Sequence, residues 1–109
     1  MIGAIAGDMI GSPYESFPIK HKDIHLRVAG FTDDTVLTVA VAHAILTGAD
    51  MAETIKAFAQ RYPHAGYGGT FRRWVWAWEN TPYNSFGNGS AMRVSPVGFA
   101  FDTTDEVLL

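Results

Sequence analysis

The chain has 109 residues, enough for one domain, and it is apolar for its size, with 48% hydrophobic and 17% charged residues. A net charge of −3 without any lysine or arginine run argues against nucleic-acid binding through a basic patch. The absence of cysteine excludes disulfides and thiolate metal sites and fits a cytoplasmic protein. Asp8 interrupts an N-terminal apolar stretch that has no basic region, so this stretch is neither a signal peptide nor a membrane span.

The expected elements are helices. Apolar residues at helical spacing predict a first helix from residue 2, which Pro13 limits, and residues 16–30 are expected to form a loop. A second helix follows Thr32 and is apolar on nearly every side up to Gly48. This pattern is typical of a buried helix with a glycine stop.

The middle of the chain predicts two further helices. Asp50, with Glu53 three residues later, forms a capping box ahead of the third helix, which Pro63 ends. Apolar residues at i, i+3, i+4 and i+7 from Phe71 to Trp78 predict the fourth. A strand is the alternative there, because the three tryptophans of this segment also alternate along the chain.

A polar loop over residues 81–89 precedes the last elements. The apolar segment 91–101 predicts a helix that Pro96 shortens or kinks. Thr103 and Glu106 then form a second capping box about one turn before the last residue. Because so short a helix is not stable alone, we expect the chain to be the N-terminal part of a longer domain.

Four oxygen-bearing side chains stand in a row at the start of the second helix: Thr32, Asp33, Asp34 and Thr35. Mg²⁺ prefers oxygen ligands, and adjacent carboxylates at a helix start can reach one cation or bridge two. The same residues fit helix capping, with Thr32 as the N-cap and two acids favoured by the helix dipole. Glu15 is similarly open to two interpretations, a general acid or base or a solvated loop acid.

Two glycine-rich segments, residues 66–70 and 84–90, precede predicted helices. Such turns expose backbone N–H groups at helix N-termini and favour phosphates, although most glycine turns are only turns. Arg93, one turn beyond the second segment, strengthens the anion-binding interpretation. Tyr67, Phe86 and the tryptophans could stack on a purine or belong to the core.

Five segments in a fixed order complete the pattern. They are residues 3–11 (GAIAGDMIG), 14–15 (YE), 31–35 (FTDDT), 66–68 (GYG) and 87–93 (GNGSAMR). This combination resembles the ADP-ribosylglycohydrolase family, which includes the enzyme that reactivates dinitrogenase reductase. The resemblance extends from residue 3 to about residue 99.

The resemblance implies an all-α orthogonal helical bundle that binds two Mg²⁺ ions in a central cleft and hydrolyses ADP-ribosyl glycosidic linkages. It implies that Thr32, Asp33 and Asp34 are metal ligands and that Glu15, Asp33 and Asp34 are catalytic. The substrate would be an ADP-ribosylated protein or a small-molecule ADP-ribose conjugate. The substrate-binding residues would be Gly66, Tyr67, Gly68 and Gly69 in the first glycine segment and Phe86, Gly87, Asn88, Gly89 and Ser90 in the second.

One part of the family pattern is missing. The family takes the other half of its metal site from a downstream Asp-x-Asp-Thr motif, which nothing after residue 99 matches. We therefore expect residues 1–109 to be the N-terminal part of a single domain with half of the dimetal site, completed by a C-terminal segment or a second copy. Two alternatives to an enzyme stay open. One is a non-catalytic binder of ADP-ribose or a nucleotide, and the other is a structural family member.

Overall fold

The computed structural model describes residues 2–15, 30–84 and 87–108, and the regular structure in these ranges is entirely α-helical. The all-α prediction is confirmed, and the strand alternative at the tryptophans is wrong. Within these ranges no helix has the length and apolar character needed to cross a membrane. The helices are α1 (Ile2–Glu15), α2 (Asp33–Thr47), α3 (Met51–Arg61), α4 (Gly69–Trp76), α5 (Gly89–Met92), α6 (Ser95–Ala100) and α7 (Thr104–Leu108).

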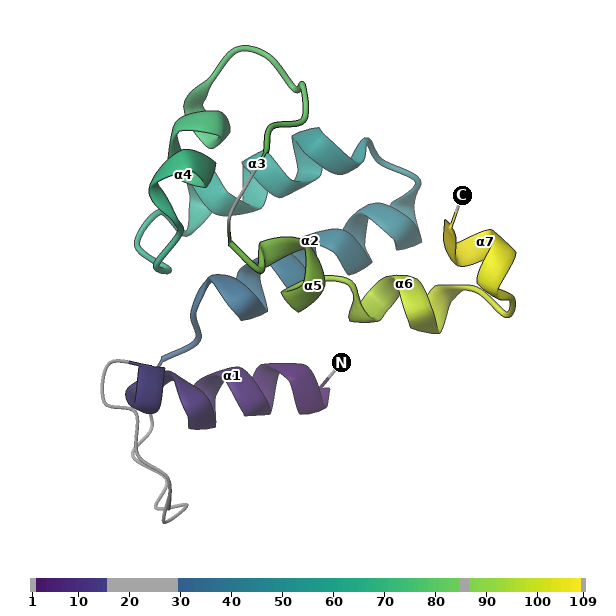
Figure 1. The fold of residues 1–109 in the computed structure, drawn as a ribbon, viewed down its shortest axis with the longest axis horizontal. Coiled ribbons are helices and arrows are strands. Elements are labelled where there is room, and N and C mark those ends of the chain that lie inside the picture. The colour runs from purple at the N-terminus through teal and green to yellow at the C-terminus, as the bar shows by residue number, and fades with distance from the viewer. Residues whose placement is uncertain (1, 16–29, 85–86, 109) are drawn as a thin grey trace.

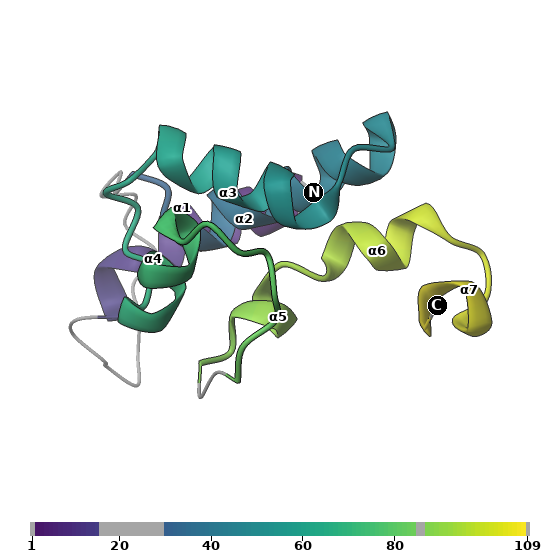
Figure 2. The same cartoon turned by 90° about the horizontal axis from the view of Figure 1, so that it is seen from above.

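Helix α2 lies at the centre of the fold, between α1 and α3, with α6 packed along it (Figure 1). Seen from above, α5 and α6 lie to one side of the α2–α3 pair (Figure 2). The prediction of a buried second helix is confirmed, because α2 supplies the largest share of the core. The core cluster consists of Val36, Leu37, Ala40, Val41, Ile55, Ala59, Tyr67, Phe71 and Val75.

Local capping explains where α2 and α3 begin and where α2 ends. The Thr32 hydroxyl accepts a hydrogen bond from the amide of Asp34, and the Asp50 carboxylate accepts one from the amide of Glu53 at 2.9 Å. Gly48 ends α2 with φ of 70°, a left-handed conformation that glycine adopts without a steric penalty. These three predicted helix boundaries are confirmed.

The apolar segment after residue 90 forms two helices where one short or kinked helix was expected. Arg93 and Val94 separate α5 from α6, and Pro96 lies in the first turn of α6, where its missing N–H is not needed. Two reciprocal hydrogen bonds then form ahead of α7. The Thr103 hydroxyl accepts from the Glu106 amide at 3.3 Å, and the Glu106 carboxylate accepts from the Thr103 amide at 3.1 Å. The second capping box is therefore confirmed.

Two predicted boundaries need correction. Helix α1 continues for two residues past Pro13, to Glu15. Helix α4 ends at Trp76, so Trp78 does not join its apolar stripe and is fully exposed. A tertiary contact explains the end of α4. The buried Lys56 ammonium donates hydrogen bonds to the carbonyl groups of Ala77 and Glu79, and these bonds hold residues 77–79 in an extended conformation.

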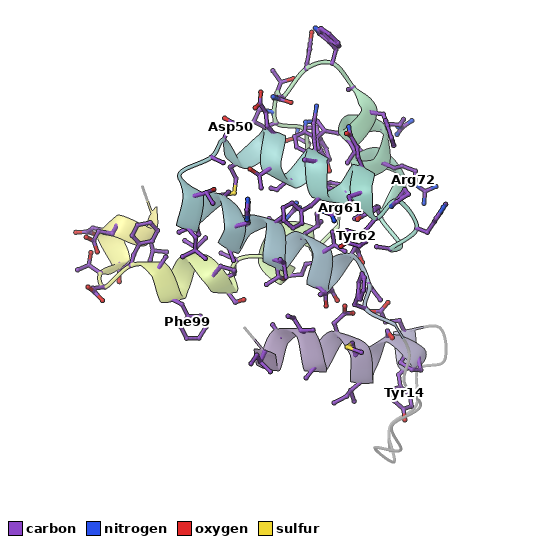
Figure 3. The ribbon with its side chains drawn as sticks, turned by 180° about the vertical axis from the view of Figure 1, so that it is seen from behind. Tyr14, Asp50, Arg61, Tyr62, Arg72 and Phe99 are labelled. Atoms are coloured by element: carbon purple, nitrogen blue, oxygen red, sulfur yellow. The ribbon has the colours of Figure 1, made fainter. Side chains whose placement is uncertain are left out.

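Some large apolar side chains lie on the outside of the described fold. Phe99 of α6 is 81% exposed and points away from α2 (Figure 3). Leu46, near the end of α2, is 85% exposed. Both positions border a small apolar hollow between α2 and α6.

Candidate metal centre and adjoining pocket

Asp8 is a buried carboxylate in the middle of α1, and it faces the start of α2. It accepts hydrogen bonds from the amide and the hydroxyl of Thr32, at 2.7 and 2.5 Å. It also accepts from the amide and the hydroxyl of Thr35, at 3.3 and 2.6 Å. The first amides of a helix have no partner within the helix, and the N-terminus favours negative charge, so Asp8 caps α2 from a second helix.

The hydrogen bonds also decide the charge of Asp8. Burial by itself would raise the pKa of this carboxyl, but the hydrogen bonds from Thr32 and Thr35 outweigh burial and lower the pKa below 3.8. Asp8 is therefore ionised at neutral pH. Sequence reasoning did not assign a role to Asp8, although a single acid within an apolar helical stretch was the available signal.

Asp8, Glu15 and Asp34 form an acidic cluster, in which one oxygen of each carboxylate lies within 4.8 Å of the others. Glu15 is the exposed last residue of α1, and Asp34 is half-buried in the first turn of α2. Burial and then the charge of Asp8 raise the pKa of Asp34. The three negative charges repel one another, and a hard divalent cation prefers carboxylate oxygens as ligands. This cluster can therefore hold a metal ion.

The loop between α3 and α4 fixes the start of α2 from the opposite side. The amide of Asp33 donates to the carbonyl of Ala65 at 2.8 Å. The ring of Tyr62, at the end of α3, meets Phe31 edge to face with centroids 5.7 Å apart. The start of α2 is therefore held by α1 on one side and by the end of α3 with its following loop on the other.

Asp33 lies outside the acidic cluster and lines a pocket of about 350 Å³. Consecutive residues of a helix point about 100° apart, so two adjacent acids face different surroundings. Burial, followed by the charges of Asp34 and Glu15, raises the pKa of Asp33. Asp33 and Asp34 thus have different surroundings in the fold, and their joint role as metal ligands stays a prediction.

Both glycine-rich segments reach the pocket that Asp33 lines. A second pocket, of about 320 Å³, shares five of its residues and is also lined by Trp74 and Ser90. Five of the nine predicted substrate residues border the first pocket: Gly68, Gly69, Gly87, Asn88 and Gly89. Its full lining is Asp33, Leu37, Gly68, Gly69, Thr70, Phe71, Tyr83, Gly87, Asn88, Gly89, Met92 and Arg93.

Two predicted substrate residues are placed differently. Gly66 and Tyr67 are not among the described residues that line either pocket. Gly66 makes the turn with φ of 98°, and the buried Tyr67 donates its hydroxyl to the carbonyl of Tyr62 at 2.8 Å. Burial and then the charge of Asp33 raise the pKa of Tyr67 to about 12. Phe86 lies outside the described residues.

The comparisons with known proteins decide the family. The sequence model of the family described as ADP-ribosylglycohydrolase matches residues 1–109. The chain belongs to the ADP-ribosylglycohydrolase family. The membership predicted from the five ordered segments is thereby confirmed, and the family is one of hydrolases. No curated protein and no solved structure matches the chain.

Proposed function

We propose that this protein is a Mg²⁺-dependent hydrolase that cleaves the glycosidic linkage between ADP-ribose and a modified protein or small molecule. The observation that carries the proposal lies at the start of α2. Asp34 belongs to the acidic cluster with Asp8 and Glu15, whereas its neighbour Asp33 lines the pocket. A sugar at the pocket wall nearest Asp33 would lie next to the cluster.

Asp8, Glu15 and Asp34 are the residues that would hold the metal, with the Thr32 hydroxyl beside them. A bound Mg²⁺ would orient substrate oxygens and make an attacking water more acidic. Asp8 contributes through its fixed position, since the hydrogen bonds from Thr32 and Thr35 hold its carboxylate in one orientation. Glu15 is the exposed member of the cluster and is the candidate general acid or base.

The pocket residues would hold the substrate. The Asp33 carboxylate can accept hydrogen bonds from ribose hydroxyls and can carry a proton more readily than an ordinary aspartate, because its pKa is raised. Gly68 and Gly69 precede or begin α4, so amides of its first turn are available to an anion. Holding the sugar and its phosphates together in one orientation is itself a large part of such catalysis.

The test is the release of ADP-ribose from proteins carrying it on arginine or on serine, measured with Mg²⁺ and with EDTA on a protein that includes the downstream half of the metal site expected from the sequence. We expect release with Mg²⁺, loss with EDTA, and a fall of roughly 100-fold or more in Asp34→Asn and Glu15→Gln. Asp105→Asn, which removes an exposed carboxylate from α7, is the matched control and should retain full activity. Binding of ADP-ribose without release from any linkage would favour a non-catalytic binder and overturn the proposal.

A further inference from the structure

Arg93 stands in the wall shared by the two pockets. Its half-buried side chain lines both of them. The Nε atom donates to the carbonyl of Gly89 at 2.7 Å, and the guanidinium carbon lies 5.4 Å from the centre of the Phe71 ring. The aromatic ring and the carbonyl therefore hold the Arg93 side chain in place in the wall of both pockets.

This guanidinium is not neutralised by the protein around it. Within the described ranges no carboxylate forms an ion pair with Arg93, and its one hydrogen bond uses Nε rather than the terminal nitrogens. Asp33 lines the same pocket, but it interacts with Arg93 only at longer range. A partly buried cation costs free energy unless an anion pairs with it, so the geometry leaves a place for an anion from outside.

Gly89 explains why the guanidinium can occupy this position. A Cβ atom at residue 89 would lie 2.9 Å from Nη2 of Arg93, closer than real contacts allow. Gly89 therefore has a steric role toward Arg93 that is separate from any role of its backbone amide. An alanine at this position would make the guanidinium shift from its present position.

We propose that Arg93 binds the diphosphate of the substrate through its terminal nitrogens and that Gly89 leaves the space this requires. The proposal rests on the proposed function, in which an ADP-ribosyl group is the substrate. A guanidinium presents two parallel donors that match two phosphate oxygens, which a lysine ammonium cannot do. Arg93 lines both pockets, so the groups attached to the two phosphates would have room in them.

The experiment measures binding of ADP and of adenosine by calorimetry to the wild type, Arg93→Met, Arg93→Lys and Arg73→Met. We expect Arg93→Met to weaken ADP binding about 10- to 100-fold and to leave adenosine binding unchanged. The ADP affinity of Arg93→Lys should lie between those of the wild type and Arg93→Met, since lysine keeps the charge but loses the paired donors. Arg73→Met removes an exposed charge from α4, outside both pocket linings, and should bind ADP like the wild type.

Gly89→Ala tests the same inference without changing any charge. We expect it to weaken ADP binding to a similar degree, whereas Gly98→Ala should have no effect, because a Cβ there meets no atom within 4 Å. Thermal unfolding of each variant shows whether it folds. If Arg93→Met unfolds, Arg93→Lys and Gly89→Ala provide the test.

Three results would overturn the inference: wild-type ADP affinity in Arg93→Met, equal losses for ADP and adenosine, or no ADP binding by the wild type. The ADP-ribose release assay separates this inference from the proposed function. Release by the wild type with an unchanged KM in Arg93→Met would overturn the role of Arg93 alone. ADP binding that depends on Arg93, without release from any linkage, would support that role and overturn the hydrolase.

Discussion

The Asp8 carboxylate receives both the amide hydrogen and the hydroxyl hydrogen of Thr32, with donor–acceptor distances of 2.7 and 2.5 Å. Asp8 lies in the middle of α1 and Thr32 is the N-cap of α2, so this pair joins two helices through one buried carboxylate. The acidic cluster is thus built on a contact that also positions α1. Changes at Asp8 should therefore affect folding as well as metal binding.

Asp8→Asn should lower the free energy of unfolding by about 2 kcal/mol, because an amide offers one acceptor oxygen where the structure needs two. Urea denaturation at neutral pH measures this change, and Asp105→Asn should leave the value unaltered. The folded-state pKa of Asp8 lies below its ordinary value of 3.8, so its stabilisation is present above that pH. It is lost as the pH falls through the folded pKa, and the difference between the two proteins should narrow there.

Asp34→Asn should have opposite effects on stability with and without metal. The folded-state pKa of Asp34 is raised, so its ionised form costs stability at neutral pH, and the amide should stabilise the metal-free protein. Mg²⁺ at 100 times its dissociation constant should stabilise the wild type by about 2.7 kcal/mol. The same Mg²⁺ concentration should stabilise Asp34→Asn very little, because one ligand of the metal is lost. Thermal unfolding with and without Mg²⁺ tests both effects, and an equal response to Mg²⁺ in the two proteins would contradict the cluster as a metal site.

Lys56→Met should destabilise the protein by about 1–2 kcal/mol, because two carbonyl groups lose a charged donor. The Lys56 ammonium donates to the carbonyls of Ala77 and Glu79 at 2.9 and 2.7 Å, and it lies 4.6 Å from the centre of the Trp74 ring. Methionine keeps most of the side-chain length without the charge. Urea unfolding, followed by tryptophan fluorescence, measures the change, and Arg73→Met is the control at an exposed position. Equal stability of Lys56→Met and the wild type would show that residues 77–79 do not need the Lys56 hydrogen bonds.

Tyr67→Phe should make stability less sensitive to alkaline pH. The folded-state pKa of Tyr67 is raised from 10.0 to about 12, so its contribution is full below pH 10 and is lost as the pH rises toward 12. Phenylalanine should cost about 1 kcal/mol at pH 8, since the hydrogen bond to the Tyr62 carbonyl is removed. Urea unfolding at pH 8 and pH 11 should show a smaller loss in the variant than in the wild type, and identical losses would contradict the assignment.

The sequence by itself determined the helices whose ends depend on local interactions. Thr32, Gly48 and Asp50 act on backbone groups within four residues, so their patterns predicted the limits of α2 and the start of α3. The unbroken apolar character of α2 likewise placed it in the core. The five ordered segments were specific enough to indicate the family, because they combine residue types that capping and packing alone do not require together.

Only the tertiary structure decided which acids meet. Asp8 reaches Thr32 across 24 residues, a contact that no local pattern encodes, and it brings Glu15 beside Asp34. The rotation of about 100° per helical residue then turns Asp33 toward the pocket. Arg93 likewise acquired its position from packing against Phe71 and from the space left at Gly89, which depends on side-chain geometry and not on residue spacing.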